Sequence, residues 1–296
     1  MIKIVFLGTA GSSPTKYRSL PAVALVHEGD LFLFDCGESA QMQMLKFGVN
    51  SSKLRAIFIS HVHGDHVIGI AGLVRTLALN RRTDPLTIFV PRGHEHVVMS
   101  LLSFDRAILG YSVEVKGIRA GEVYRGRGFS VNAFPLRHSI TAYGYAFKED
   151  DKRRFVEEDA KKLGIKGDMH SQLQKKGKIK VGTKIIKLSQ VTNVQLGKKV
   201  VYTGDTRPSK DTVKAAADAD LLIHESSYCE KEKSLAVERM HSTATEAAQV
   251  AKKAHVKRLL LTHISARYND IGILEEEAQK IFKNSEVAED GDIIIV

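Results

Sequence analysis

Short apolar runs alternate with turns and with helical patterns through both halves of this 296-residue chain. Such runs are typical of buried strands, and apolar residues three or four positions apart are typical of helices that cover a sheet. The expected strands span residues 2–7, 22–26, 31–35, 57–60, 86–90, 113–118, 129–134, 142–147, 199–202, 221–224, 258–261 and 292–296. The expected helices span residues 39–47, 69–79, 94–109, 209–217, 243–254 and 271–283. Strands and helices mixed in two similar halves predict an α/β fold in which two sheets pack together and helices cover their outer faces.

The segment from about residue 148 to 194 departs from this pattern. Residues 148–187 hold 13 Lys and Arg against 7 Asp and Glu, and therefore six of the ten net positive charges of the chain. A charged, helix-permissive stretch is followed there by scattered glycines, a composition that buries little apolar surface. We therefore expect one domain over 1–296 with a protruding basic arm inserted at about 148–194. The local excess of positive charge favours a polyanionic partner, although a solubilising insertion has the same composition.

Composition also bears on the compartment. The chain contains no run of about 18 apolar residues, so we expect no transmembrane helix. Its first residues read as a strand that ends in a glycine turn, so we expect no signal peptide. Cys36 and Cys229 are the only cysteines and lie far apart in the sequence. Two isolated cysteines fit a reducing compartment better than a disulfide scaffold, which predicts a cytoplasmic protein.

The densest chemical motif is His61-x-His63-x-Asp65-His66, directly after an expected buried strand. Asp65 stands where a helix can begin, so the motif occupies a strand-to-helix turn that can direct several side chains to one point. Histidine and carboxylate ligands without cysteine suit a catalytic rather than a structural zinc. A solvated histidine-rich loop is the alternative. It is disfavoured because further His and Asp residues recur at strand ends downstream.

His138, Asp205 and His263 each follow the end of an expected strand. With the motif above they make seven candidate ligands: His61, His63, Asp65, His66, His138, Asp205 and His263. One catalytic zinc takes about three protein ligands and a water, so seven candidates predict two metals bridged by a carboxylate, for which we choose Asp205. Two such metals favour hydrolysis, especially of a phosphodiester. His94 and His96 have similar spacing, but we expect them at a helix start unconnected to this cluster.

Several longer strings carry a family resemblance: Phe6–Gly11, Phe34–Glu38, Tyr202–Pro208, His241–Ala244 and Leu261–Tyr268. With the ligand motif they make nearly the whole chain similar to the ribonuclease Z family of the metallo-β-lactamase superfamily. The resemblance implies a four-layer αββα sandwich with two zinc ions per subunit. It assigns His61, His63, His138 and Asp205 to the first ion, and Asp65, His66, His263 and the shared Asp205 to the second.

The resemblance also implies an activity. The family removes the 3′ trailer from precursor tRNA by phosphodiester hydrolysis and leaves a 3′-hydroxyl on the tRNA. Asp65 would orient or deprotonate the attacking hydroxide, and His241, steered by Glu225, would protonate the leaving 3′ oxygen. From the residues alone, His241 also reads as the start of a helix beside the cap Ser242 and the first-turn Glu246. In the family the arm serves the partner subunit's active site, which implies a homodimer.

Two segments depart from the family pattern. The first loop reads Pro14-x-Lys16-x-Arg18-Ser19, with serine where the family often has asparagine; Lys16 and Arg18 are predicted to contact phosphates, and a solvated loop is the alternative. The arm resembles the tRNA-clamping arm through residues 160–167, which hold the candidate RNA contacts Lys161, Lys162 and Lys166. Its Gly167 is followed by Asp168-Met169 where the family has Gly-x-Pro.

Two other functions stay open on the sequence alone. One is a small-molecule phosphodiesterase or another hydrolase of the superfamily, against which the basic arm argues. The other is an RNA-binding protein without catalysis, against which the complete ligand set argues.

Overall fold

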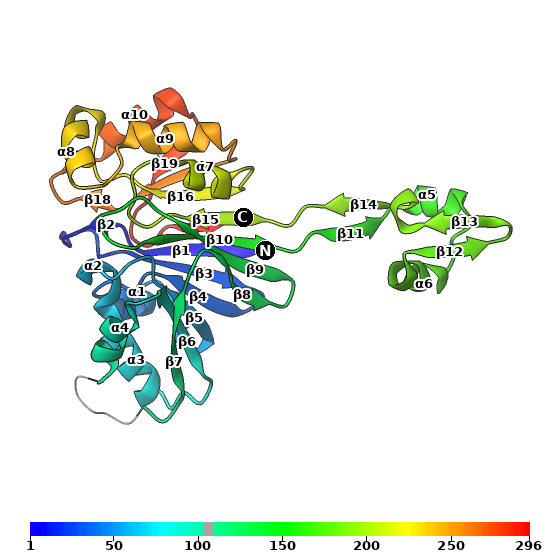
Figure 1. The fold of residues 1–296 in the computed structure, drawn as a ribbon, viewed down its shortest axis with the longest axis horizontal. Helices are drawn as coiled ribbons and strands as arrows, with labels where there is room; N and C mark the ends of the chain where they lie inside the picture. The colour runs from blue at the N-terminus through cyan, green and yellow to red at the C-terminus, as the bar shows by residue number, and fades with distance from the viewer. Residues whose placement is uncertain (104–108) are drawn as a thin grey trace. The chain divides into compact units, whose positions relative to one another are not determined.

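The computed structural model describes residues 1–103 and 109–296 (Figure 1). The chain divides into two compact units. The larger unit consists of Met1–Lys148 and Lys198–Val296, and the smaller one of Glu149–Gly197. We keep the name arm for the smaller unit.

Two seven-stranded sheets form the centre of the larger unit. In spatial order the first sheet contains β20 (Ile293–Ile295), β1 (Ile2–Gly8), β3 (Ala22–His27), β4 (Asp30–Phe34), β5 (Leu54–Phe58), β6 (Leu86–Pro91) and β7 (Val113–Ile118). The second contains β19 (Ser285–Val287), β17 (Leu259–Thr262), β16 (Leu221–Glu225), β15 (Lys199–Tyr202), β10 (Tyr143–Glu149), β9 (Phe129–Pro135) and β8 (Gly121–Gly126). A short parallel pair, β2 (Ala10–Gly11) with β18 (Ile264–Ser265), lies outside both sheets.

Helices cover the outer face of each sheet (Figure 1). The first half of the chain contributes α1 (Ala40–Lys46), α2 (Gly64–Val67), α3 (Gly69–Leu79) and α4 (Glu95–Ser103), and the second half contributes α7 (Lys210–Ala216), α8 (Lys233–Glu238), α9 (Ala244–Lys253) and α10 (Gly272–Ile281). One apolar cluster fills the space between the sheets, a second joins the first sheet to α1, α3 and α4, and a third joins the second sheet to α7, α9 and α10. The predicted four-layer αββα sandwich is confirmed.

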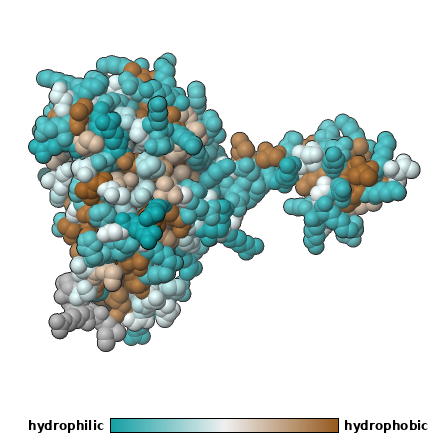
Figure 2. Space-filling model, in the orientation of Figure 1, coloured by the Kyte–Doolittle hydropathy of each residue, from teal (hydrophilic) through white to brown (hydrophobic). Residues whose placement is uncertain are grey.

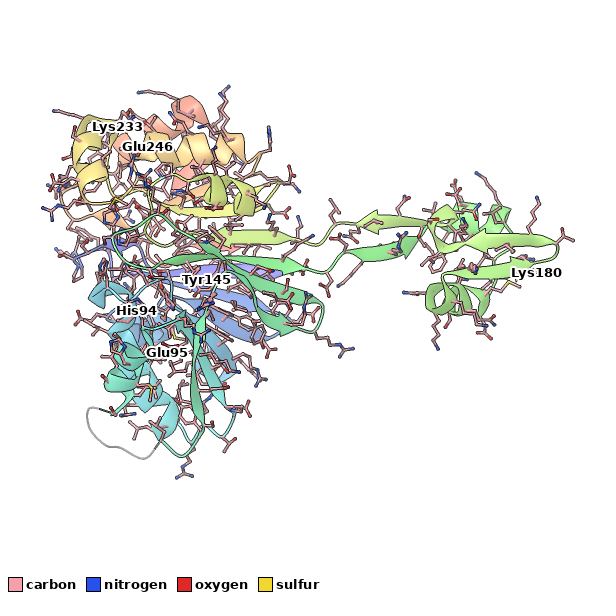
Figure 3. All side chains as sticks on the ribbon, viewed as in Figure 1. His94, Glu95, Tyr145, Lys180, Lys233 and Glu246 are labelled. Carbon is pink, nitrogen blue, oxygen red and sulfur yellow. The ribbon has the colours of Figure 1, made fainter. Side chains whose placement is uncertain are left out.

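Aromatic rings dominate the cluster between the sheets. The ring of Phe58 on β5 stacks on Phe89 with centroids 5.0 Å apart and on Phe34 at 5.5 Å. Tyr145 on β10 is fully buried (Figure 3), and its hydroxyl donates a hydrogen bond to the carbonyl oxygen of Ile59 at 2.6 Å. Because Ile59 follows β5, this bond ties the second sheet to the segment that leads into the His61 motif.

Parallel pairing determines where the loops with polar side chains gather. β4, β5, β6 and β7 run parallel to one another, as do β15, β16, β17 and β19. Ligands of α/β proteins are bound at the carboxyl ends of parallel strands, where successive loops meet. The segments after β5, β15 and β17 carry His61, Asp205 and His263, and β16 ends at Glu225.

The arm has its own small core. It comprises β11 (Lys152–Phe155), α5 (Glu157–Lys162), α6 (Met169–Lys176), β12 (Lys178–Val181), β13 (Lys184–Lys187), a 3₁₀ turn (Leu188–Gln190) and β14 (Thr192–Gln195). β11 pairs with β14 and β12 with β13. Ala160, Ile165, Leu173, Ile186 and Val191 are buried there. As expected, this segment buries little, but paired strands and two helices bring its few apolar residues together in a core of their own. In Figure 2 most of its visible face is hydrophilic.

The other differences from the expected elements are local. β8, β19, α8 and the short β2–β18 pair were not predicted, because none of them contains a long apolar run. The helix expected over 94–109 is α4, Glu95–Ser103, and residues 104–108 of that prediction lie outside the described residues. Among the helices of the described ranges, none has both the length and the apolar content to cross a membrane.

Candidate metal centre and catalytic site

All seven predicted ligands meet at the carboxyl edge of the sheets. They form two groups whose nitrogen and oxygen atoms lie within 4.8 Å of one another: His61, His63, His138 and Asp205 in one, and Asp65, His66 and His263 in the other. These are the two sets predicted from the sequence, apart from the sharing of Asp205. A third combination, Asp205, His241 and His263, meets the same criterion.

Asp205 lies between the two groups. Its Oδ2 atom is 3.6 Å from Nε2 of His61, whereas its Oδ1 atom is 3.4 Å from Nε2 of His66 and 3.2 Å from Nε2 of His263. A carboxylate that offers one oxygen to each group has the arrangement of a bridging ligand between two metal ions. Gly204 allows this placement: its φ is +66°, and a Cβ there would come within 2.6 Å of Cβ of Ser60.

Three buried atoms at this point test whether the residues suit a cation. Nε2 of His66, Oδ1 of Asp205 and Nε2 of His263 are buried and have no hydrogen-bond partner within the described parts of the chain. Buried polar atoms are normally satisfied, and these three direct their lone pairs toward one another. A divalent cation would satisfy all three at once. The residues therefore fit a metal centre with nitrogen and oxygen ligands.

Asp35, which was not singled out from the sequence, holds one of these ligands. It follows β4 and is fully buried, and its Oδ2 atom accepts hydrogen bonds from Nδ1 of His66 at 2.8 Å, the Tyr202 hydroxyl at 2.7 Å and the Ser60 hydroxyl at 2.8 Å. With its proton on Nδ1, His66 presents the lone pair of Nε2 to the centre. The sequence did contain one signal for Asp35, which is a carboxylate at the end of an expected buried strand.

Two further ligands are oriented in the same way. Nδ1 of His138 donates a hydrogen bond to the carbonyl oxygen of Met240 at 3.1 Å, and Nδ1 of His263 donates one to the Ser227 hydroxyl at 2.9 Å. Nδ1 is thereby occupied in each ring, and Nε2 faces the other candidate ligands. Ser227 had not been predicted either.

The electrostatics of the site favour positive charge. Burial lowers the pKa of His66, but the carboxylates of Asp205 and Asp35 outweigh burial and raise that pKa well above its usual value. Burial lowers the pKa values of His61 and His63, which keeps these rings neutral and able to act as ligands. A histidine between two buried carboxylates marks a place where a proton or a metal ion is stabilised.

Asp65 is ionised and points into the same space. Its Oδ2 atom accepts a hydrogen bond from the Ser12 backbone N–H at 3.0 Å and lies 3.5 Å from Nε2 of both His66 and His263. Burial raises the pKa of this carboxyl group, but the close approach of His263 and the charges of both histidines outweigh burial and hold the pKa well below its usual range. Asp65 thus stays anionic at the edge of the cleft.

His241 and Glu225 are in direct contact, as the predicted pair requires. Nδ1 of His241 donates a hydrogen bond to Oε1 of Glu225 at 3.0 Å. Glu225 is fully buried and also accepts from the backbone N–H groups of Thr206 at 3.1 Å and Ser242 at 2.9 Å. Burial lowers the pKa of His241, but the Glu225 and Asp205 carboxylates outweigh it and raise the pKa to about 9. The imidazole is therefore protonated at neutral pH.

These groups open on a cleft of about 550 Å³. It is lined by Ser12, His63, Asp65, His138, Ser139, Asp205, Tyr228, Leu235, Glu238, Arg239, Met240, His241 and Arg267. The Arg267 guanidinium lies over the Tyr228 ring at 4.9 Å from its centroid. Neither Arg239 nor Arg267 had been singled out from the sequence, although Arg267 belongs to the string Leu261–Tyr268, which carried the family resemblance. Arg239 and Arg267 place guanidinium groups in the wall of this polar cleft, beside the carboxylates of Asp65, Asp205 and Glu238, and such groups suit a phosphate-containing substrate.

The predicted RNA-contact residues lie outside this cleft. Lys16 and Arg18 line a neighbouring hollow of about 410 Å³. Lys16 is exposed, whereas Nη1 of Arg18 donates hydrogen bonds to Oγ1 of Thr9 at 2.7 Å and to the carbonyl oxygen of Ala288 at 2.6 Å. The Arg18 side chain is only 10% exposed, so most of its hydrogen-bonding capacity is used internally. The arm residues Lys161, Lys162 and Lys166 are exposed.

His94 directly precedes α4 (Figure 3) and His96 is the second residue of that helix. Both belong to none of the candidate ligand groups found among residues 1–103 and 109–296. Their spacing resembles that of a ligand pair, but these two residues lie at the start of a helix, as expected.

Comparison with known proteins places this site in a family. A family model described as "Anti-Pycsar protein Apyc1" matches residues 2–179, and one described as "Beta-lactamase superfamily domain" matches residues 188–264. The chain is 40% identical to a ribonuclease Z of Methanosarcina acetivorans, over 98% of this chain and 96% of that one. It is 43% identical to a ribonuclease Z of Gemmatimonas aurantiaca, over 97% and 93% of the two chains. The chain belongs to the ribonuclease Z family.

The fold agrees with this membership. The crystal structure of human tRNase Z, short form, is similar with a TM-score of 0.71 and 26% identity, and the match covers 99% of this chain and 98% of that one. The similarity to ribonuclease Z proteins therefore includes the arm as well as both sheets.

Proposed function

We propose that this member of the ribonuclease Z family is a zinc-dependent endoribonuclease that removes the 3′ trailer from precursor tRNA. It hydrolyses one phosphodiester and leaves a 3′-hydroxyl on the tRNA. The observation that carries the proposal is the shared position of Asp205 between two ligand groups, beside the His241–Glu225 pair, in a chain that resembles ribonuclease Z along its whole length.

The proposed centre holds two zinc ions per subunit. His61, His63, His138 and Asp205 would hold one ion, and Asp65, His66, His263 and Asp205 the other. Nitrogen and carboxylate donors without thiolates suit catalytic zinc. When bound, a metal pair lowers the pKa of water and neutralises charge on the phosphoryl oxygens.

The protein's own groups then divide the proton transfers. Asp65 is anionic and faces the cleft, so it can orient the attacking water and accept its proton. His241 is protonated because Glu225 stabilises its charge, so it can donate a proton to the departing 3′ oxygen. A ribose 3′-alkoxide is a poor leaving group, and a well-placed acid contributes about 10²–10⁴-fold to such a step.

The test is cleavage of a precursor tRNA by the purified protein, with the cut mapped to the nucleotide. Chelation should abolish cleavage and added zinc should restore it. Asp65→Ala and His241→Ala should lose cleavage while RNA binding survives. His96→Ala is the matched control, because this histidine has ligand-like spacing but lies outside the centre. Cleavage that is unaffected by removal of metal would refute the proposal.

The exposed arm lysines are proposed to grip the tRNA away from the scissile bond. Remote contacts of this kind orient a substrate and release counterions, so binding should depend steeply on salt. Replacing Lys161, Lys162 and Lys166 together with alanine should impair cleavage of precursor tRNA far more than hydrolysis of bis(p-nitrophenyl) phosphate. Equal losses on the two substrates would contradict the clamp.

We also propose a homodimer. Met42 and Leu45 on α1, Met99 on α4 and Ile68 before α3 are 50–71% exposed, and these helices are neighbours on the outer face of the first sheet. An apolar patch of this kind is typical of a subunit interface. Leu45→Lys should shift the mass measured by light scattering to that of one chain; an unchanged mass would place the interface elsewhere. Because both cysteines of the chain are buried and unpaired, we further propose a reducing compartment such as the cytoplasm.

A further inference from the structure

We propose that Arg207 is a positioning residue for the acid His241: with Glu246 it forms a buried clamp that fixes the His241 backbone. This inference rests on the proposed function, because it needs His241 to act as the acid. Arg207 lies two residues after Asp205 and does not line the catalytic cleft.

The clamp is a paired, nearly buried set of hydrogen bonds. Nη1 of Arg207 donates to the carbonyl oxygen of His241 and to Oε2 of Glu246 at 2.6 Å, while Nη2 donates to Oε1 of Glu246. The two side chains are only 11% and 8% exposed. An arginine that pairs with a carboxylate through two nitrogens has a fixed orientation, which a lysine cannot reproduce.

Glu246 connects this pair to the start of α9. Its Oε2 atom accepts a hydrogen bond from the Thr243 N–H at 3.0 Å, and Oγ1 of Thr243 accepts one from the Glu246 N–H at 3.1 Å. This capping box fixes the first turn of the helix, immediately after His241 and Ser242. Arg207 thus contacts both the backbone of the acid and the first turn of the helix that follows it.

The backbone before His241 needs such a restraint. Met240 has φ +61°, in the left-handed region that is unfavourable for a residue other than glycine. Its carbonyl oxygen also accepts the hydrogen bond from Nδ1 of His138. A strained backbone persists only where its surroundings fix it, and Arg207 supplies a contact directly after the strained residue.

The backbone around Arg207 joins a third loop to this point. The Arg207 N–H donates to the carbonyl oxygen of Arg137 at 2.8 Å, and the Arg137 N–H donates to Oγ1 of Thr206 at 3.1 Å. The residues next to His138 and Asp205 are therefore connected to the segment that holds His241. Loss of the Arg207 side chain leaves these backbone hydrogen bonds in place. It should therefore displace His241 more than it displaces the candidate ligands His138 and Asp205.

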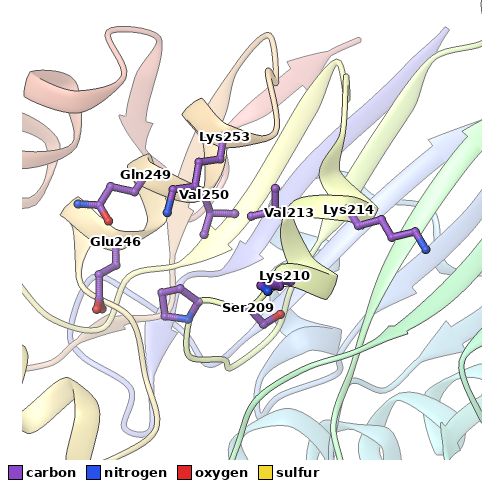
Figure 4. Close-up of a pocket in the computed structure, with 9 residues that line it drawn as sticks. Ser209, Lys210, Val213, Lys214, Glu246, Gln249, Val250 and Lys253 are labelled. Carbon is purple, nitrogen blue, oxygen red and sulfur yellow. The ribbon is translucent and has the colours of Figure 1, made fainter.

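Glu246 can be altered without touching the catalytic cleft. It lines a separate groove of about 530 Å³ between α7 and α9 (Figure 4), together with Ser209, Lys210 and Gln249. The clamp therefore lies between this groove and the cleft. A substitution at Glu246 therefore tests the clamp without changing a residue that lines the cleft.

The chemistry of the leaving group gives a selective readout. A 3′-alkoxide needs a proton as it departs, whereas p-nitrophenolate leaves as a stable anion without one. A misplaced acid therefore slows cleavage of RNA more than hydrolysis of bis(p-nitrophenyl) phosphate. General distortion of the site slows both, so the ratio of the two rates separates positioning from damage.

The experiment measures single-turnover cleavage of precursor tRNA and turnover of bis(p-nitrophenyl) phosphate for Arg207→Lys, Glu246→Gln and His241→Ala. We expect Arg207→Lys to lower the cleavage rate of precursor tRNA about 10²-fold, the usual effect of a misplacement of about 1 Å, with a much smaller loss on the aryl ester. Glu246→Gln should show the same selectivity to a lesser degree. Arg258→Lys is the control, because Arg258 also pairs with a glutamate, Glu286, and precedes β17, at the opposite end of this strand from His263.

Each outcome supports or overturns the clamp. If His241→Ala slows both substrates equally, the acid role itself fails and the clamp falls with the proposed function. If His241→Ala is selective but Arg207→Lys and Glu246→Gln are wild-type or slow both substrates equally, only the clamp is overturned. Should Arg207→Lys melt below the assay temperature, the rate ratio of Glu246→Gln alone distinguishes these cases.

Discussion

Replacing Asp35 with asparagine should weaken metal binding without removing a single ligand. The Asp35 carboxylate accepts four hydrogen bonds: from the Ser60 N–H at 2.7 Å, the Ser60 hydroxyl at 2.8 Å, the Tyr202 hydroxyl at 2.7 Å and Nδ1 of His66 at 2.8 Å. An amide has one oxygen, so its NH₂ group must face at least one of these donors. A buried donor without a partner costs about 1–3 kcal/mol.

The effect on the metal follows from His66. With a charged acceptor on Nδ1, the ring is held in one tautomer and Nε2 is more basic. Loss of such a carboxylate behind a ligand typically lowers metal affinity or activity about 10–100-fold, which corresponds to about 1.4–2.7 kcal/mol. We expect Asp35→Asn to fall in this range.

Affinity is measured by competition with a chromophoric zinc chelator, and stability by urea unfolding of the same samples. Asp220→Asn is the matched control, because Asp220 is also largely buried and accepts hydrogen bonds from the Lys199 N–H and the Lys257 ammonium group, at 2.9 and 2.8 Å. It precedes β16, at the opposite end of this strand from Glu225. A folded Asp35→Asn with wild-type affinity would refute the reasoning, and an equal loss of affinity in Asp220→Asn would assign the effect to stability alone.

Three further predictions concern the rest of the larger unit. Phe58→Ala should lower the free energy of unfolding by about 3–5 kcal/mol in urea titrations, because this buried ring stacks on Phe89; a loss below about 1 kcal/mol would contradict the packing. Burial raises the pKa of the Cys36 thiol, so iodoacetamide should modify Cys36 only after unfolding, and rapid alkylation of the native protein would contradict this. Burial raises the pKa of Asp220, but hydrogen bonds led by that from Lys257 outweigh it and lower the pKa. The stability difference between wild type and Asp220→Asn should therefore be present at pH 7 and shrink as pH falls below about 4, and a difference that is constant down to pH 2 would refute it.

Periodicity predicted most of the two sheets because their inner strands are continuously apolar. β15 has the predicted bounds, Lys199–Tyr202, and most other strands differ by one to three residues at an end. β8, Gly121–Gly126, was not predicted because it lies at the edge of its sheet and all of its residues are exposed or half-buried. An edge strand needs no apolar run, since only one neighbour pairs with it.

The meeting of the seven candidate ligands could be predicted, but the residues that support them could not. Histidine and aspartate at strand ends are uncommon enough to stand out, as His61 and Asp205 did. Asp35 and Arg207 belong to strings that carried the family resemblance, but like Ser227 they are residue types that occur at many surface positions, and the strings do not reveal their contacts. The contacts that define them join positions well apart in sequence, for example 31 residues between His66 and Asp35 and 39 between Arg207 and Glu246. Such roles follow only from tertiary structure.

The two halves of the chain each supply part of one site, and this has an energetic consequence. His61 and His66 follow β5 in the first sheet, whereas Asp205 and His263 follow strands of the second sheet. Neither half alone holds a complete ligand group, because Asp205 must approach the His61 motif. The two groups form only when the sheets pack on the aromatic cluster around Phe58. A metal that binds only this packed state stabilises it by mass action, so the free energy of metal binding is also free energy of association between the two sheets.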